Sequence, residues 1–467
     1  MPLKGLPVLL LLCDPEQRAK RTESRNFFMQ LGLIRSDFLP ARPKTLGGPV
    51  TAISLGAVIY LVLVRLLRFQ RVRALRRKYG DGPRVNANAS DKKNRPVAGR
   101  PDVRLTPEEA QEIVLRVTQL EMPGLMRFSL VFALFKTYAI PTISEILLQS
   151  KQLSTPDNVS RRFADTGILI STWTSCPLID FTRMNLKEEE VDSRHAIAIA
   201  RTNWLHNRWP NIKNEDYIYT MSLFALEPVR WAQLYGWREL LPIEREAYFV
   251  LWKEIGRRMN IRDFPETLQD LIEWSENYEE TAMVPAISNY KVGQYTLDYM
   301  LSLVTEWFGV RKFMYQVSLC LMEPRVRTAF MLPEPSPVMV TITRIFMSFF
   351  AIRARYFELP RFKRKEFIPR KIPAEKFKEM MPRFYPAMFG KVPWYKPESK
   401  GISRIWQNIL VKIGYLDKKS IPSPKYKSEG YRLEECGPIS LEQDGHAEVM
   451  KMAAGIQGCP VTGIWAR

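Results

Sequence analysis

The chain has 467 residues, of which 46% are hydrophobic and 11% aromatic, so it can bury a large core in one or more domains. Its 69 basic and 49 acidic residues give a net charge of +20; no nucleic-acid motif is present, so an anionic membrane surface is the simpler partner. Five scattered cysteines exclude a disulfide framework and a zinc finger, and three histidines exclude most metal sites that need several imidazoles.

The N-terminal part of the chain is predicted to hold a membrane anchor. Thr45 to Val64 is a run of twenty uncharged residues, long enough to cross a bilayer as one helix, and we place the anchor at residues 45–67. A buried core helix is the alternative, but residues 68–105 form a basic stem and a linker rich in Pro, Gly and Asn. This basic flank predicts a single-pass anchor with the following chain in the cytosol, and residues 1–44 are expected to be a disordered tail.

The rest of the chain is predicted to be all-α. Thr106-Pro107-Glu108-Glu109 is a helix start, with a hydroxyl cap and a glutamate three residues later, and helical periodicity continues through a core at residues 106–355. The apolar stretch Val338 to Ile352 is interrupted by Arg344, which favours a core or surface-lying helix over a second span. Residues 356–467 are basic and rich in Pro and aromatics, and are expected to wrap the core and touch lipid.

Two strings carry candidate chemistry. Arg162, Asp165 and Thr166 are expected to share one helix face, where they would offer a cation, a proton acceptor and a hydroxyl donor. An ion pair beside a threonine is the simpler structural explanation. His206 ends a helical run, and a single protein nitrogen suffices for haem because the porphyrin supplies four ligands itself. A hydrogen-bonded core histidine is the alternative there.

Rival metal sites fit less well. Asp192-x-x-His195 resembles half of a di-iron carboxylate motif, but no second copy exists. Gly455-Ile456-Gln457-Gly458-Cys459 has the glycine-to-cysteine spacing of thiolate-ligated monooxygenases, but lacks their upstream phenylalanine and the later glycine. His446 is expected to be a surface or packing residue.

The order of several short motifs points to a family. Arg162-x-x-Asp165-Thr166 followed by Arg201-Thr202-x-x-x-His206 resembles the ER-bound oxygenase family of the mycophenolic acid pathway, which shares its catalytic domain with the bacterial rubber oxygenase, the latex-clearing protein. Each motif is weak alone, but their shared order is fairly specific. Further similar strings lie at residues 135–144, 227–230, 236–238, 283–285 and 445–446.

The resemblance implies a globin-like helical core around haem b, with His206 as the proximal iron ligand and Arg162, Asp165 and Thr166 as catalytic residues of the distal pocket. It implies cleavage of a carbon–carbon double bond in the isoprenoid side chain of a lipophilic prenylated molecule, with dioxygen as co-substrate, in secondary metabolism at the endoplasmic reticulum membrane. The rubber oxygenase has lysine where this chain has Asp165, which puts the general base in doubt. A non-catalytic membrane-bound scaffold or lipid-binding protein is the alternative function.

Overall fold

The computed structural model describes residues 49–80, 105–153, 155–178, 191–304, 309–413 and 417–465. The tail predicted at residues 1–44 and most of the predicted linker lie outside these ranges. By its internal contacts the chain divides into two units, Met1–Val62 and Leu63–Arg467, and each is described by itself.

The predicted anchor sequence is helical where the structure describes it. Helix α2 runs over Pro49–Arg68 without an acidic residue, and α3 follows over Gln70–Tyr79. Large apolar side chains of α2 are exposed, among them Ile53 at 71%. Two stretches of the described chain are long and apolar enough to cross a membrane, Thr51–Tyr79 and Pro337–Tyr356, and one bent helix pair passes the same test only when taken together.

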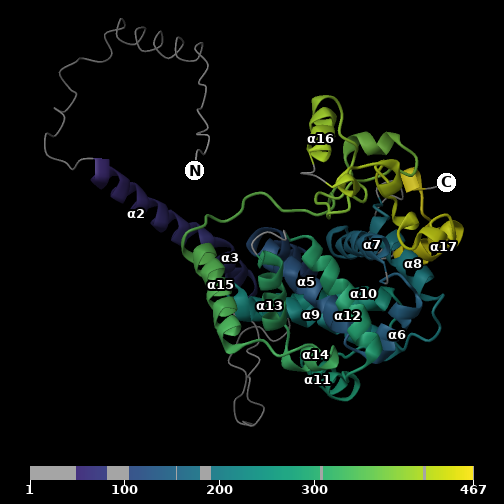
Figure 1. Cartoon of the computed structure of the whole chain (residues 1–467), viewed down its shortest axis with the longest axis horizontal. Helices are drawn as coiled ribbons and strands as arrows, with labels where there is room; N and C mark the ends of the chain where they lie inside the picture. Colours follow the sequence, from purple (N-terminus) through teal and green to yellow (C-terminus); the bar gives the residue numbers. More distant parts are fainter. Residues whose placement is uncertain are drawn as a thin grey trace, which may run out of the picture. The chain divides into compact units, whose positions relative to one another are not determined.

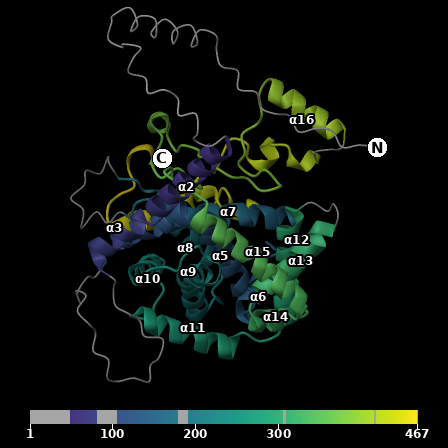
Figure 2. The same ribbon diagram turned by 90° about the vertical axis from the view of Figure 1, so that its left-hand side faces the viewer.

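Helices also make up the second unit (Figures 1 and 2). Among its described residues the only β-type pairing is an isolated bridge between Phe384 and Tyr431, so the predicted all-α class is confirmed. The helices are α4 (Pro107–Arg116), the π-helical turn η2 (Val117–Glu121), α5 (Pro123–Thr137), α6 (Pro141–Gln149), α7 (Pro156–Ser175), α8 (Arg194–His206), α9 (Asn214–Tyr235), α10 (Pro242–Arg258), α11 (Leu268–Ala282), α12 (Ile287–Ser302), α13 (Val310–Leu321), α14 (Pro324–Ala329), α15 (Pro337–Tyr356), α16 (Ile402–Lys412) and α17 (His446–Gln457).

Local sequence signals explain where many of these helices begin. At α4 the Thr106 hydroxyl accepts from the Glu109 amide, and the Glu109 carboxylate accepts from the Thr106 amide, so the predicted capping box is confirmed. Proline in the first turn has a fixed φ that suits a helix and lacks an N–H that would have no partner there. It opens α4, α5, α6, α7, α10, α14 and α15.

The core of the second unit lies where α9 packs against α5 and α10, with α4 packed on α10. Aromatic side chains fill these interfaces: the rings of Phe132 and Trp231 lie 4.9 Å apart, and those of Phe224 and Trp252 stack at 4.7 Å. Trp231 and Trp252 are each only 1% exposed, so burial of such large rings is a main stabilising contribution.

The C-terminal part of the chain lies across α7 and α8 and is mostly irregular. Arg194 of α8 donates to the carbonyls of Pro369 and Arg370, at 2.6 and 2.8 Å. Helix α17 packs directly on α8, and Figure 1 shows it beside that helix. Helix α16 stands apart from the helical body in both views and has no buried residue.

Candidate functional site

Helix α7 presents two different polar faces. It begins at a Thr155 cap, whose hydroxyl accepts from the Asn158 amide. Arg161 and Asp165 are buried, at 5% and 3% exposure, whereas Arg162 and Thr166 are half-buried. Because residues four apart lie one above the other on a helix, Arg162 and Thr166 line the same stripe.

The Arg162 guanidinium forms no hydrogen bond or ion pair within the described part of the chain. Its positive charge nevertheless affects the pKa values of two aromatic side chains from other segments. It lowers the pKa of His206, and it partly offsets the burial that raises the pKa of Tyr138. Arg162 is thus near enough to affect both pKa values, and its donors are unused among the described residues.

The Thr166 hydroxyl is also unusual for a helix. Further along α7 the hydroxyls of Thr172 and Thr174 donate to carbonyls one turn earlier, at 2.8 and 3.0 Å. Thr166 makes no such bond to any residue that the structure describes, so its hydroxyl is available to a bound molecule. Arg162 and Thr166 together are two unused donors on one stripe of α7.

His206 is the last residue of α8 and is half-buried. Its ring lies 5.4 Å from that of Tyr217, centroid to centroid. Burial, reinforced by the charge of Arg162, lowers the pKa of His206 to about 4, so the imidazole is neutral at physiological pH. Neither ring nitrogen has a hydrogen-bond partner among the described residues, which leaves a lone pair for a ligand.

These side chains fit what a haem would require of the protein. An iron ligand must be a neutral imidazole, and His206 is held in that form. Groups that could stabilise negative charge near such a cofactor would be hydrogen-bond donors, such as Arg162 and Thr166. No cluster of three or more His, Cys, Asp and Glu side chains suited to a metal occurs in the described ranges.

Asp165 points to a different set of partners. Its carboxylate accepts from the Tyr395 hydroxyl at 2.5 Å, from the Gly437 amide at 2.9 Å and from Arg161 Nε at 3.4 Å. Burial raises the pKa of Asp165, while these three donors act to lower it. The structure thus brings Arg162 and Thr166 together but turns the third predicted site residue toward the C-terminal part of the chain.

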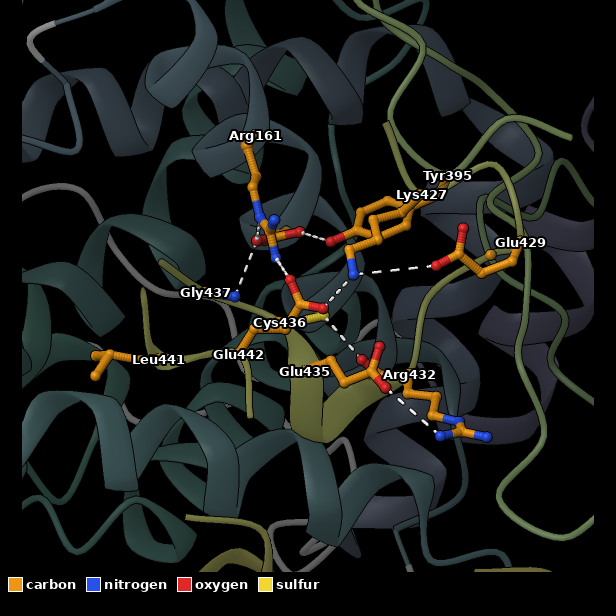
Figure 3. Close-up of polar contacts among 12 residues, drawn as sticks. Arg161, Tyr395, Lys427, Glu429, Arg432, Glu435, Cys436, Gly437, Leu441 and Glu442 are labelled. Atoms are coloured by element: carbon orange, nitrogen blue, oxygen red, sulfur yellow. Dashed lines mark hydrogen bonds and ion pairs between the residues drawn. The ribbon is translucent and has the colours of Figure 1, made fainter. Parts of the chain in front are cut away.

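This contact extends into a buried ion-pair network (Figure 3). Arg161 donates to Glu442 at 3.0 Å, and Glu442 also accepts from Lys427. The Arg161 guanidinium stacks over the Trp394 ring, 5.2 Å from its centroid. Burial acts to lower the pKa of Arg161, but Tyr395 and the carboxylates of Asp165 and Glu442 raise it, so the cation is kept.

Helix α8 is held by the same C-terminal residues. Arg201 donates to the carbonyls of Cys436, Leu441 and Asp444, at 2.9, 2.7 and 2.8 Å. We call residues 436–446, which bind α7 through Gly437 and α8 through these carbonyls, the C-terminal clamp. One end of the clamp is tight: a Cβ on Gly445, whose φ is +76°, would come 2.0 Å from Trp204 Cε2.

The other two histidines have packing roles. His195 is 1% exposed, its Nδ1 lies 3.0 Å from the Trp173 carbonyl, and burial lowers its pKa to about 3. His446 is 8% exposed, with Nε2 2.9 Å from the Glu442 carbonyl. The packing alternative expected for His446 is therefore confirmed.

Several strings that suggested the family have structural functions. Lys136 lies in a buried cluster, with Nζ 2.7 Å from Glu279, 3.1 Å from Glu323 and 3.4 Å from Glu227. Arg230 binds Glu227 as well, at 2.6 Å. This cluster joins α5, α9 and α11 to the residue before α14, so these strings define the scaffold around the site.

Sequence reasoning missed Tyr138, Tyr217 and Tyr395. Tyr138 lies in one of the family-like strings, which was a usable signal. Tyr217 follows His206 closely in sequence, but nothing in its surroundings indicated that its ring would face the imidazole. Tyr395 lies in an irregular Pro-rich segment 230 residues from its partner Asp165, where no periodicity helps.

The fold and these contacts define an all-helical protein that has apolar helices long enough to span a membrane. Comparison with known proteins gives its family. Residues 138–352 match the family described as ER-bound oxygenase mpaB/B'/rubber oxygenase, catalytic domain, and the chain belongs to this family. Membership supports an oxygenase function and therefore an oxidoreductase.

Relatives extend the similarity beyond the matched domain. The chain is 26% identical over 423 residues to ER-bound oxygenase mpaB' of Penicillium brevicompactum, covering 84% of this chain and 89% of that protein. It is 30% identical over 247 residues to ER-bound oxygenase mpaB of Penicillium roqueforti, covering 50% of this chain and 74% of that protein. The names of these relatives and the apolar helices of this chain both indicate membrane association.

Proposed function

We propose that the protein is a membrane-anchored, haem-dependent oxygenase that uses dioxygen to cleave a carbon–carbon double bond in an isoprenoid side chain. Family membership supports the oxygenase class. The observation that carries the rest is the pairing of a neutral, unpartnered His206 imidazole with the unpartnered donors of Arg162 and Thr166, within the described residues.

The protein's own groups have distinct tasks in this proposal. When bound, haem b would supply the iron chemistry that activates dioxygen. His206 holds the cofactor through its neutral ring nitrogen. Arg162 and Thr166 donate hydrogen bonds to negative charge that develops in the pocket, and preorganised donors of this kind are a large source of rate enhancement.

For Asp165 the sequence and the observed contacts favour different roles. The sequence predicts that it accepts or relays an allylic proton, and burial does raise its pKa. However, its carboxylate already accepts from Tyr395, Gly437 and Arg161. These contacts favour a positioning residue that fixes α7 against the C-terminal clamp.

The proposed substrate is a lipophilic prenylated molecule of meroterpenoid or other secondary metabolism. Such molecules partition into bilayers, so an anchored enzyme meets them at a raised local concentration. We propose a single-pass anchor in the endoplasmic reticulum membrane with the catalytic domain in the cytosol. The basic flank after the apolar run and the names of the relatives support this placement.

Absorption spectroscopy of the detergent-solubilised full chain tests the proposal. Oxidised, reduced and carbon-monoxide spectra should show an imidazole-ligated haem, and His206→Ala should lose most of the haem absorbance. His446→Gln is the matched control, because it removes a histidine that only packs, and it should keep the spectrum. A purified wild-type chain that takes up no haem would contradict the proposal and favour the scaffold or lipid-binding alternative.

A further inference from the structure

Helix α15 carries an apolar outer face that no described part of the protein covers. Thr343 is the single buried residue among its twenty. Val338, Ile345, Phe349 and Ile352 are 67%, 65%, 59% and 52% exposed. The opposite side packs on α13 and α9, and Figure 2 shows α15 lying across the face of the helical body that is turned to the viewer. Water is a poor solvent for such a surface, so it needs a partner.

Although α15 passes a length and hydropathy test for a membrane span, its flanks exclude a single crossing. The chain after α15 returns to residues that precede it: the Lys365 amide donates to the Gln119 carbonyl at 3.0 Å, and Tyr395 donates to Asp165 at 2.5 Å. One passage through a bilayer would put these partners on opposite sides. Helix α15 therefore has both ends on the same side.

The end of α15 also meets the chain that leaves the anchor helix. Within the unit formed by residues 63–467, Arg68 Nη1 lies 3.5 Å from the Leu359 carbonyl, and Arg71 donates to the Arg361 carbonyl. Arg68 is the last residue of α2. If α2 crosses the membrane, this contact places the chain just after α15 at the level where the anchor emerges.

The charges around α15 match an acidic lipid surface. The helix has no Asp or Glu, and it contains Arg344, Arg353 and Arg355, of which Arg353 forms an ion pair with Glu358 at 2.8 Å. Three exposed basic residues follow shortly after it, at Arg361, Lys363 and Lys365. Each basic side chain close to an acidic leaflet contributes roughly 1 kcal/mol of attraction.

We infer that α15 lies flat in the surface of the anionic membrane leaflet that faces the catalytic domain, with Ile345, Phe349 and their apolar neighbours inserted below the headgroups. The helix is a second membrane contact that does not cross. This inference rests on the proposed anchoring by α2. It adds that the helical body contacts the bilayer surface directly and is not attached through the anchor helix alone.

Fluorescence quenching by lipid-attached quenchers tests this contact in the full chain. The protein is reconstituted into nanodiscs that contain phosphatidylserine, in a Cys13→Ser, Cys320→Ser background, because the other three cysteines are buried. A bimane label is then placed by Ile345→Cys, by Leu61→Cys in the anchor, or by Glu276→Cys on the exposed surface of α11. Quenchers near the headgroups and near the bilayer centre report depth.

The expected result is strong quenching at positions 345 and 61 and little at 276. Position 345 should respond mainly to the shallow quencher, and less so when phosphatidylcholine replaces phosphatidylserine. An unquenched label at 345 beside a quenched label at 61 would overturn the inference while leaving the anchor intact. Deep quenching at 345 would instead show a crossing helix. An unquenched label at 61 would contradict the proposed anchor and not α15.

A charge placed on the outer face gives a second check. Phe349→Glu in the Ile345→Cys chain should lower quenching at 345 by roughly twofold or more, because an acidic group resists burial in hydrocarbon and is repelled by anionic lipid. Gln269→Glu on α11 is the matched control and should change nothing. Equal quenching in both variants would contradict the inference.

Discussion

Adjacent arginines on α7 do different work, and the difference lies in what each side chain contacts. Arg161 is buried between Asp165 and Glu442, so it belongs to the framework. Arg162 is half-buried and has no hydrogen-bond partner among the described residues, so its donors remain for a ligand. A sequence shows two neighbouring arginines and does not tell which of them is left without a protein partner.

At this scale the proposed donors can be tested by removing one hydrogen bond at a time. Arg162→Gln and Thr166→Val should keep haem absorbance and lower turnover of a farnesylated substrate by roughly 10²- to 10³-fold, the usual effect of losing a preorganised donor. Thr174→Val is the control, because that hydroxyl donates to carbonyls of its own helix, at Ile170 and Ser171. Unchanged turnover in both pocket variants would show that the pocket is wrongly assigned.

Asp165→Asn separates the two roles of that side chain. An asparagine oxygen can still accept from the Gly437 amide, and its NH2 group can donate to the Tyr395 hydroxyl oxygen, whereas an amide cannot accept a proton at neutral pH. If Asp165 positions α7, the variant should keep turnover within roughly tenfold and the shape of its pH profile, since general-base catalysis contributes about 10²- to 10⁴-fold. A larger loss with haem retained would favour direct proton transfer.

At the scale of elements, the C-terminal clamp bridges α7 and α8, which also pack directly on each other. Arg201 binds three of its carbonyls, and the Gly437 amide binds Asp165. Since α7 carries Arg162 and Thr166 and α8 carries His206, the clamp binds both helices that carry the proposed ligand and the proposed donors.

Gly445→Ala should therefore weaken the proposed site although residue 445 is not one of the site residues. The new Cβ would collide with Trp204 at a backbone conformation that alanine adopts poorly, which costs on the order of 2–3 kcal/mol. We expect a lower unfolding temperature and weaker haem retention. Gly455→Ala is the control, because a Cβ there meets nothing within 4 Å. A variant Gly445→Ala as stable as wild type would show that the clamp does not hold α8.

Elements with local signals were predictable and those held by distant contacts were not. The Thr106 cap, the proline-started helices and the all-α class follow from neighbouring residues. The orientation of Asp165 depends on Tyr395, which lies 230 residues away in an irregular segment. Spacing on α7 alone therefore grouped Asp165 with Arg162 and Thr166 and gave no sign of Tyr395. The sequence also did not show that one apolar face of α15 is exposed. A helix that packs on protein and a helix that contacts lipid can have the same spacing of apolar residues.

At the scale of the whole molecule, buried neutral histidines link stability to pH. Burial lowers the pKa of His195 to about 3, whereas in the unfolded chain it titrates near the usual histidine pKa of about 6.5. Between these values only the unfolded state binds the proton, so folding stability falls as the pH drops from about 6.5 toward 3. The slope for this one residue is about 1.4 kcal/mol per pH unit.

Unfolding temperatures at pH 7 and pH 5 in detergent measure this linkage. Wild type should lose stability on acidification, and His195→Asn, whose side-chain amide can still donate to the Trp173 carbonyl, should lose less. The difference between the two slopes isolates His195 from carboxylates that titrate nearby. Identical slopes would mean that His195 is not buried in its neutral form.

The clamp also has a consequence for the order of assembly. Cys436, the first of its residues, is synthesised 235 positions after Arg201, the α8 side chain to which it binds. A chain that is still growing can form α7 and α8 and pack one on the other, but it lacks the carbonyls that bind Arg201. On the proposed function, insertion of the haem would then be a late event in biogenesis, after translation has passed the helices that receive it.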